Sequence, residues 1–171
     1  TIASESQAAV LGGITSFMDM PNTRPHTLSR ELLEQKFQRA GETSVANYSF
    51  FMGIASSNLE EALRVNNEWV CGITDDGLYF DDEKGILANQ PAFLEQLFAR
   101  AETLVALHCE DDALIAANTR RFVQRFGEAI PIEAHEHIRS ESACYEATKR
   151  VVELAQKHGN RLHIYHVSTA R

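Results

Sequence analysis

The 171-residue sequence lacks the features that mark membrane-spanning, secreted and nucleic-acid-binding proteins. No apolar run approaches the roughly 18–20 residues that span a bilayer, and no basic segment followed by an apolar one opens the chain. Basic residues are outnumbered, with 16 Lys and Arg against 24 Asp and Glu, and the net charge of −8 would repel a phosphate backbone. We therefore expect a cytoplasmic protein that binds neither membranes nor nucleic acid, although a local arginine or metal could still hold an anionic small substrate.

Cysteine is also scarce. The three cysteines, Cys71, Cys109 and Cys144, are odd in number, far apart and without a CxxC pair, which indicates neither a disulfide framework nor a structural zinc knuckle. Cys109 follows His108, which raises the hypothesis of a Cys–His nucleophile. Adjacent residues of a strand point to opposite faces, so these side chains do not easily meet. We interpret Cys109 as a small buried thiol.

The composition, with 44% hydrophobic and 8% aromatic residues, is that of one globular domain covering residues 1–171 without an internal boundary. Short apolar runs with little alternation predict strands that are buried on both faces. Five such runs occur: Ile14–Pro21, Ala46–Ile54, Trp69–Thr74, Thr103–Glu110 and Leu162–Thr169.

Helical segments lie between the predicted strands. A capping box of Ser57 and Glu60 predicts a helix through Val65. Apolar spacing and helix stops such as Gly159 predict the others, at Ile2–Leu11, Ser29 to about Ala40, Pro91–Arg100, Asp112–Phe126 and Ser140–His158. Strand–helix alternation indicates an α/β fold with a parallel sheet. A closed barrel needs eight strand–helix units and about 250 residues, so the alternatives are an open five-stranded sheet and part of a barrel.

Polar residues follow several of the predicted strands, at the sheet edge where parallel α/β proteins form their active sites. They are Asp19, Asn22, Thr74 to Gly77, His108, Glu110, His166 and Ser168. Two histidines and a carboxylate suit zinc, which lowers the pKa of bound water to about 7 for attack on an amide carbonyl. From spacing alone, metal ligation and structural hydrogen bonding by these histidines are equal alternatives.

Other polar residues carry weaker signals. His163 and His166 are an odd number of positions apart, so only one of them can face the axis if both lie in a strand. His135-Glu136-His137 resembles the HxH pair of a metallohydrolase, but it follows Pro131 in a polar stretch that we expect to be a loop. Asp81, Asp82 and Glu83 predict a solvated acidic loop, with calcium ligation as the alternative.

Four segments resemble motifs of the dihydroorotases. Met18–Pro25 (MDMPNTRP) is similar to the segment after strand two of that family, and Ile138–Ala143 (IRSESA) to the loop and helix start before strand six. His108–Asp111 (HCED) and His166–Thr169 (HVST) resemble the segments at strands five and six. The resemblance implies a partial (β/α)8 TIM barrel of the metal-dependent amidohydrolase type, about strands 2–6. It also implies the reversible cyclisation of N-carbamoyl-L-aspartate to L-dihydroorotate in pyrimidine biosynthesis.

The same resemblance implies a zinc site of one or two ions, with His108 and His166 as ligands and Asn22 holding the substrate carboxylate. Many relatives carry a lysine at the end of strand four, whereas another branch carries TDDG and uses an aspartate there. Thr74-Asp75-Asp76-Gly77 resembles that branch, so Asp76 is the expected third ligand, with Asp75 as the alternative. The shorter aspartate favours a single metal ion.

Two elements of the dihydroorotase pattern are expected outside this sequence. The HxHxRE segment of strand one would precede Thr1, and the catalytic aspartate of strand eight, the general base, would follow Arg171. We therefore expect no catalytic residue within these 171 residues, weak metal binding and no turnover by this chain alone. The rival hypotheses are a non-catalytic scaffold for a partner such as aspartate transcarbamoylase, and another cyclic amidohydrolase acting on hydantoins or ureides. A homo-oligomer is a further alternative.

Overall fold

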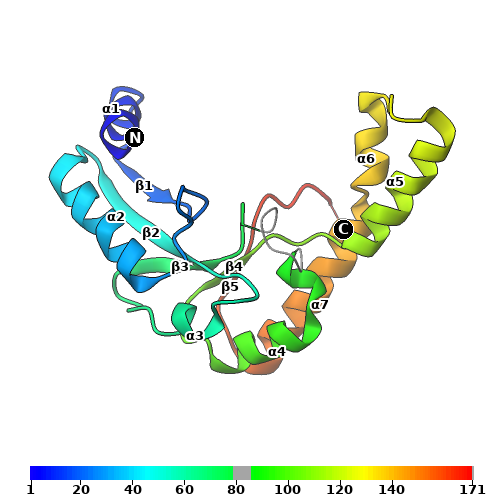
Figure 1. The fold of residues 1–171 in the computed structure, drawn as a ribbon. Helices are drawn as coiled ribbons and strands as arrows, with labels where there is room; N and C mark the ends of the chain where they lie inside the picture. The colour runs from blue at the N-terminus through cyan, green and yellow to red at the C-terminus, as the bar shows by residue number, and fades with distance from the viewer. Residues whose placement is uncertain (79–85, 171) are drawn as a thin grey trace.

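The computed structural model describes residues 1–78 and 86–170, and its centre is one curved sheet of five parallel strands (Figure 1). The strands pair in sequence order, each with the next along the chain. They are β1 (Ser16–Asp19), β2 (Asn47–Gly53), β3 (Val70–Thr74), β4 (Val105–Leu107) and β5 (Leu162–Ile164). The predicted parallel α/β sheet is confirmed, although each strand is shorter than the apolar run that predicts it.

Helices connect the strands, and their ends follow local hydrogen-bonding chemistry. They are α1 (Ile2–Leu11), α2 (Arg30–Thr43), α3 (Leu59–Ala62), α4 (Pro91–Arg100), α5 (Asp112–Phe126), α6 (His135–Ile138) and α7 (Glu141–His158). The side chains of Ser29, Asp111 and Ser140 accept backbone N–H groups at the starts of α2, α5 and α7. Gly159, in the left-handed conformation, ends α7. No helix within the described ranges is long and apolar enough to cross a bilayer.

Two sequence predictions about helices are wrong. The capping box at Ser57 does not form: α3 has only four residues and begins after Asn58. Asn58 instead accepts from the N–H of Ala55 at 2.8 Å and donates to the carbonyl oxygens of Leu28 and Gly53, at 2.8 and 3.0 Å. This side chain therefore ties together the loops after β2 and before α2, which competes with a longer helix.

The segment around His135 and His137, predicted as a loop, is helical. A 3-10 turn at Ile132–Ala134 leads directly into α6. The turn closes with a hydrogen bond from the N–H of Ala134 to the carbonyl of Pro131, at 3.0 Å. Proline is favourable at the start of such a turn because its fixed φ suits it and its missing N–H is not needed there.

The core lies between the outer face of the sheet and the helices that cover it. Phe50 of β2 is fully buried, and its ring contacts Phe37 of α2 edge-on at 4.8 Å. Other buried members are Met52, Ile73, Val105 and Leu107 of the strands and Leu33, Leu94, Leu97 and Val151 of the helices. Cys109 joins the same core and is 3% exposed, so burial raises the pKa of its thiol. Its interpretation as a buried thiol is confirmed.

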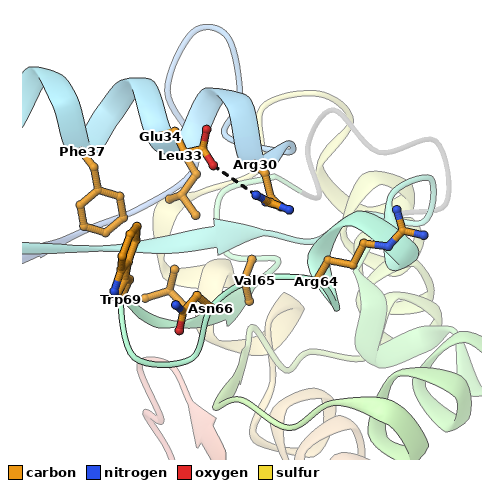
Figure 2. A pocket seen from close by; sticks show the side chains of 9 residues that line it. Arg30, Leu33, Glu34, Phe37, Arg64, Val65, Asn66 and Trp69 are labelled. Carbon is orange, nitrogen blue, oxygen red and sulfur yellow. Dashed lines mark hydrogen bonds and ion pairs between the residues drawn. The ribbon is translucent and has the colours of Figure 1, made fainter.

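A pocket lies between α2 and the segment that precedes β3 (Figure 2). The pocket has a volume of about 370 Å³, and α2 lines it opposite the segment that precedes β3. Leu33 and Phe37 contribute from α2, and Val65 and Trp69 from the opposite segment. The side chain of Trp69 remains 63% exposed. This pocket shares no residue with the polar cluster described below.

Candidate metal centre

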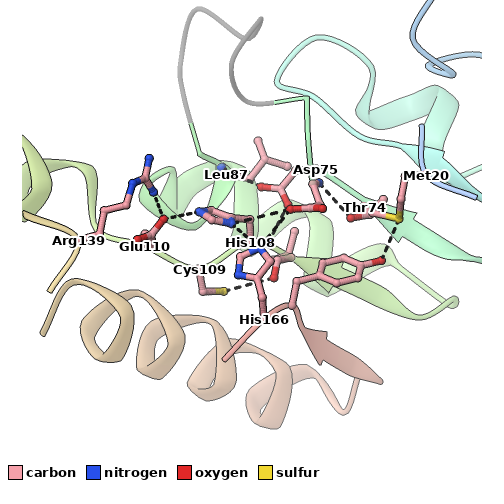
Figure 3. Close-up of polar contacts among 12 residues, drawn as sticks. Met20, Thr74, Asp75, Leu87, His108, Cys109, Glu110, Arg139 and His166 are labelled. Atoms are coloured by element: carbon pink, nitrogen blue, oxygen red, sulfur yellow. Dashed lines mark hydrogen bonds and ion pairs between the residues drawn. The ribbon is translucent and has the colours of Figure 1, made fainter. Parts of the chain in front are cut away.

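Three polar side chains that follow consecutive strands meet at the carboxyl edge of the sheet. Figure 3 shows the two histidines among them, His108 and His166. Asp76 follows β3, His108 follows β4 and His166 follows β5. The separation between His108 Nδ1 and His166 Nε2 is 3.0 Å. Asp76 Oδ1 lies 3.5 Å from His166 Nε2 and 3.8 Å from His108 Nδ1. The structure thus brings together the three residues that the sequence predicts as metal ligands.

The donor set and its spacing fit zinc. A tetrahedral zinc ion with ligand bonds of about 2.0–2.1 Å places neighbouring ligand atoms about 3.3 Å apart. The three separations in the cluster bracket that value. His108 is buried, with 4% exposure, whereas the side chain of His166 is 57% exposed. Two imidazole nitrogens and one carboxylate oxygen therefore converge from the protein side and leave the solvent side open for a water molecule or a substrate.

Asp75 and Asp76, the two candidates for the acidic ligand, point in different directions. Asp75 is 2% exposed, and its carboxylate accepts from the backbone N–H groups of His108 at 3.0 Å and Leu87 at 3.3 Å. Burial raises the pKa of Asp75 to about 7, against the lowering effect of these two hydrogen bonds. Asp75 therefore holds the end of β4 in place from within the protein, and Asp76 is the carboxylate that reaches the two histidines.

Glu110 and Arg139 lie on the far side of the His108 ring from the cluster (Figure 3). Glu110 Oε2 is 2.7 Å from His108 Nε2, and Arg139 Nη1 forms an ion pair with the same oxygen. Burial raises the pKa of Glu110, but the hydrogen bond from His108 and the charge of Arg139 outweigh it and lower that pKa below its ordinary value. The sequence marks Glu110 as a polar strand-end residue in the HCED segment and Arg139 as part of the IRSESA segment, but it gives neither residue a role at the site.

Hydrogen bonds from α7 hold the segment that follows β4 in place. Asp111 accepts from the N–H of Leu114 at 3.0 Å, and its other oxygen is 2.9 Å from Arg150 Nη1. Arg150 also donates to Asn89 Oδ1 at 3.1 Å, and Asn89 donates to the carbonyl of Glu110 at 2.8 Å. Asn89 and Arg150 lie 61 positions apart in the sequence. No local pattern links residues so distant, which is why the sequence does not identify this support.

His166 lies in a turn beyond β5, because that strand ends at Ile164. Its φ of 36° is in the left-handed region, which non-glycine residues occupy rarely and mostly where the surroundings enforce it. The prediction that only one of His163 and His166 faces the axis assumes that both lie in the strand; only His166 joins the cluster, and it does so from the turn after β5. His163 lies within β5, contacts the ring of Tyr165 at 4.9 Å and has no place in the cluster.

Asn22, the predicted substrate-binding residue, lies against the turn that follows β3. A Cβ atom added to Gly77 would come within 2.5 Å of Asn22 Nδ2, so the amide packs directly on that glycine. Gly77 is the neighbour of Asp76 in sequence, and the side chain of Asn22 is exposed. The loop after β1 therefore reaches the rim of the cluster.

Asp19, a further strand-end candidate, faces away from the cluster. Its Oδ2 is 2.5 Å from Lys36 Nζ of α2, on the outer face of the sheet, and Lys36 also donates to the carbonyl of Met20 at 2.9 Å. The predicted acidic loop of Asp81, Asp82 and Glu83 lies outside the described residues.

A pocket of about 720 Å³ opens beside the cluster. His108, Glu110, Arg139, His166 and Ser168 are among the residues that line it. Exposed histidines of α6 line its rim as well, and one of them, His137, stacks parallel to Phe122 with 6.1 Å between ring centroids. The HxH pair is therefore part of the pocket wall and lies outside the three-residue cluster.

Known proteins resemble this chain over nearly all of its length, although no protein-family model matches it. A dihydroorotase of Methanosarcina acetivorans is 28% identical over 168 residues, which are 96% of this chain and 34% of that protein. An allantoinase of Solibacter usitatus is 31% identical over 176 residues, covering 99% of this chain and 37% of that protein. The chain thus spans just over a third of the length of these relatives.

Solved structures show the same fold. The L-hydantoinase (dihydropyrimidinase) of Arthrobacter aurescens superimposes with a TM-score of 0.83 at 22% identity, over 98% of this chain and 37% of that one. The dihydropyrimidinase of Brevibacillus agri superimposes with a TM-score of 0.68 at 24% identity, over 99% and 37%. The five parallel strands therefore match part of the amidohydrolase TIM barrel of the hydantoinases. In sequence the chain is similar to a dihydroorotase and an allantoinase, and in fold it is similar to part of a hydantoinase.

Proposed function

We propose that this chain forms part of the active site of a dihydroorotase, which interconverts N-carbamoyl-L-aspartate and L-dihydroorotate in pyrimidine biosynthesis. The observation that carries the proposal is the convergence of Asp76, His108 and His166 from three adjacent strand ends. The similarity to a dihydroorotase over 96% of the chain supports it, and so do the MDMPNTRP, HCED and HVST segments.

In this proposal Asp76, His108 and His166 hold one zinc ion. When bound, zinc lowers the pKa of a water molecule to about 7 and polarises the ring carbonyl that the water attacks. His108 is fixed by its burial and by the hydrogen bond from its backbone to Asp75, which keeps the two ligands from β3 and β4 in register. The exposed side of the cluster faces the pocket in which the substrate ring would lie.

Asn22 is the proposed contact for the substrate carboxylate. Its amide lies on Gly77, beside the acidic ligand, and its side chain is exposed to incoming molecules. An amide N–H donates a hydrogen bond to a carboxylate without adding a charge to the site. We assign the general base to a segment outside these 171 residues, so turnover is a property of the whole protein.

A second candidate is a cyclic amidohydrolase that acts on a hydantoin or a ureide. The 31% identity to an allantoinase and the TM-score of 0.83 to a hydantoinase favour it. All three substrate classes contain a cyclic amide, so the metal cluster serves each of them. Dihydroorotate carries a ring carboxylate that hydantoin and allantoin lack, and Asn22 is therefore the residue expected to separate these substrates.

The test begins with metal content. Elemental analysis of the whole protein and of its Asp76→Ala variant should give stoichiometric zinc in the first and a large loss in the second. Asp19→Ala is the matched control, because that strand-end aspartate pairs with Lys36 on the opposite face. Zinc retained by Asp76→Ala would contradict the assigned ligand set. A protein without zinc would instead support a scaffold that binds a partner such as aspartate transcarbamoylase.

Substrate assays decide between the two enzyme classes. Hydrolysis of dihydroorotate, with little activity on hydantoin and allantoin, would support the dihydroorotase. Asn22→Ala should then raise KM for dihydroorotate more than it lowers kcat, because the contact binds a group remote from the reacting carbonyl. Activity on hydantoin or allantoin alone would overturn the dihydroorotase proposal in favour of the second candidate.

A further inference from the structure

The two ring nitrogens of His108 have different partners. Nδ1 faces His166 and Asp76, whereas Nε2 lies 2.7 Å from Glu110 Oε2. An ionised carboxylate only accepts hydrogen bonds, and a neutral imidazole carries hydrogen on one nitrogen alone. The contact with Glu110 therefore requires hydrogen on Nε2, and in the neutral ring the lone pair of Nδ1 points toward the cluster.

Glu110 is itself fixed at both its side chain and its backbone. Arg139 forms an ion pair with the same Oε2 atom that faces His108, and Asn89 holds the carbonyl oxygen of Glu110 at 2.8 Å. The Glu110 side chain is 15% exposed. Arg139 lies between α6 and α7, so its position depends on both helices. Rotation of the carboxylate away from His108 would break the ion pair, which opposes that movement.

We propose that Glu110, held by Arg139, is a positioning residue that keeps His108 in the Nε2–H tautomer and directs its Nδ1 lone pair at the metal position. The inference rests on the proposed metal site and adds two residues to it. A carboxylate that accepts from the outer nitrogen of a ligating histidine orients the ring and makes the inner nitrogen a stronger donor to metal. Partners of this kind change metal affinity about 10- to 100-fold when they are removed.

A second carboxylate of the chain offers a matched control. Glu95 Oε1 lies 2.8 Å from His158 Nε2 and 2.6 Å from Lys157 Nζ, so it also joins one histidine to one cation. This group lies between α4 and α7, away from the cluster. Glu95→Leu removes the same kind of contact that Glu110→Leu removes, without touching the proposed ligands.

The first measurement is the tautomer of His108 in the metal-free whole protein. Histidine labelled with ¹⁵N distinguishes Nδ1–H from Nε2–H by NMR at alkaline pH, and loss of a signal in His108→Gln identifies the residue. We expect Nε2–H in the wild type, in Glu95→Leu and in Glu110→Gln, whose amide oxygen can replace the carboxylate oxygen. We expect a mixture of tautomers in Glu110→Leu. Nδ1–H in the wild type, or an unchanged tautomer in Glu110→Leu, would overturn the proposal.

The second measurement is the dissociation constant for zinc alone. Glu110→Leu should raise it about 10- to 100-fold, Glu110→Gln should raise it less, and Glu95→Leu should leave it unchanged. Equal affinities in Glu110→Leu and the wild type would overturn the positioning role. If the wild type binds no zinc while its tautomer still depends on Glu110, the metal function fails and the control of the His108 tautomer stands.

Arg139→Met keeps the test decisive if Glu110→Leu does not fold. This variant retains the carboxylate beside His108 but removes the cation that holds it. We expect a shift in the same direction as in Glu110→Leu and smaller in size, both in the tautomer ratio and in the zinc dissociation constant. No change in either quantity would show that Arg139 has no part in positioning His108.

Discussion

The side-chain amide of Asn22 rests on the backbone of Gly77, so closely that a Cβ at residue 77 would lie 2.5 Å from Asn22 Nδ2. Gly77 also has a φ of 74°, a backbone conformation that is unfavourable for any residue with a side chain. The loop after β1 and the turn after β3 therefore share one small space beside Asp76, and only glycine leaves room for both.

Gly77→Ala should destabilise the fold for two separable reasons. The left-handed backbone costs an alanine about 1–2 kcal/mol, and the clash with Asn22 adds to that. Gly159→Ala is the control for the first cost, since Gly159 is in the left-handed conformation, with a φ of 72°, and has nothing within 4 Å of its added Cβ. Urea unfolding should show a larger loss for Gly77→Ala than for Gly159→Ala. Asn22→Ala should reduce that excess, and equal losses in the two glycine variants would contradict the packing described.

Asp75 and Asp76 should respond differently to truncation. Asp75→Ala leaves two buried backbone N–H groups without their acceptor, and each such group costs about 1–3 kcal/mol. Asp76→Ala removes a half-buried carboxylate that only faces the two histidines. In the presence of a chelator, we expect urea unfolding to show a clear loss of stability for Asp75→Ala and little change for Asp76→Ala. The reverse order would exchange the roles of the two residues.

The ion pair between Asp111 and Arg150 of α7 should make the stability of the fold depend on pH. Partial burial raises the pKa of Asp111, but its hydrogen bonds from the backbone of Leu114 and from Arg150 outweigh this and lower the pKa. The folded state therefore prefers the carboxylate. The resulting stability is present above the ordinary aspartate pKa of about 3.9 and is lost as the pH falls through that value and then through the lower folded-state pKa.

Asp111→Asn should accordingly be less stable than the wild type at neutral pH, by about 1 kcal/mol for a partly exposed ion pair. The difference should disappear in acid, where both proteins carry an uncharged side chain at this position. Thermal unfolding at several pH values measures it. Glu34→Gln, which removes an exposed i,i+4 pair with Arg30, is the control and should show a smaller pH-dependent difference. A constant difference across the acid range would contradict the charge-based explanation.

Much of the fold can be predicted from local patterns. The predicted bounds of Ile2–Leu11, Pro91–Arg100 and Asp112–Phe126 are the observed bounds of α1, α4 and α5. Each has a local end signal: a capping residue before α1 and α5 and a proline opening α4. The strand order and the gathering of polar strand ends at one edge then follow from strand–helix alternation.

The remaining features depend on contacts between distant segments. Asn58 bonds to Leu28, thirty positions away, and this contact overrides the local capping box at Ser57. Arg139 reaches Glu110 across 29 positions. A sequence pattern can mark Asp75 and Asp76 as two adjacent acids at a strand end. Only the three-dimensional arrangement separates the one that is buried against backbone N–H groups from the one that faces the histidines.

The order of the strands gives the three clustered side chains unequal mechanical support. Within the described ranges, β3 and β4 each have a neighbour on both sides, whereas β5 pairs with β4 alone. Asp76 and His108 therefore follow strands that are paired on both sides. His166 follows a strand that is paired on one side, and it lies in a backbone turn that is already strained. The strength of metal binding by the three side chains depends on the least supported of them, His166. A molecule or segment that docks along the outer edge of β5 would determine how rigidly His166 is held. Through His166 it would also determine how strongly the cluster binds metal.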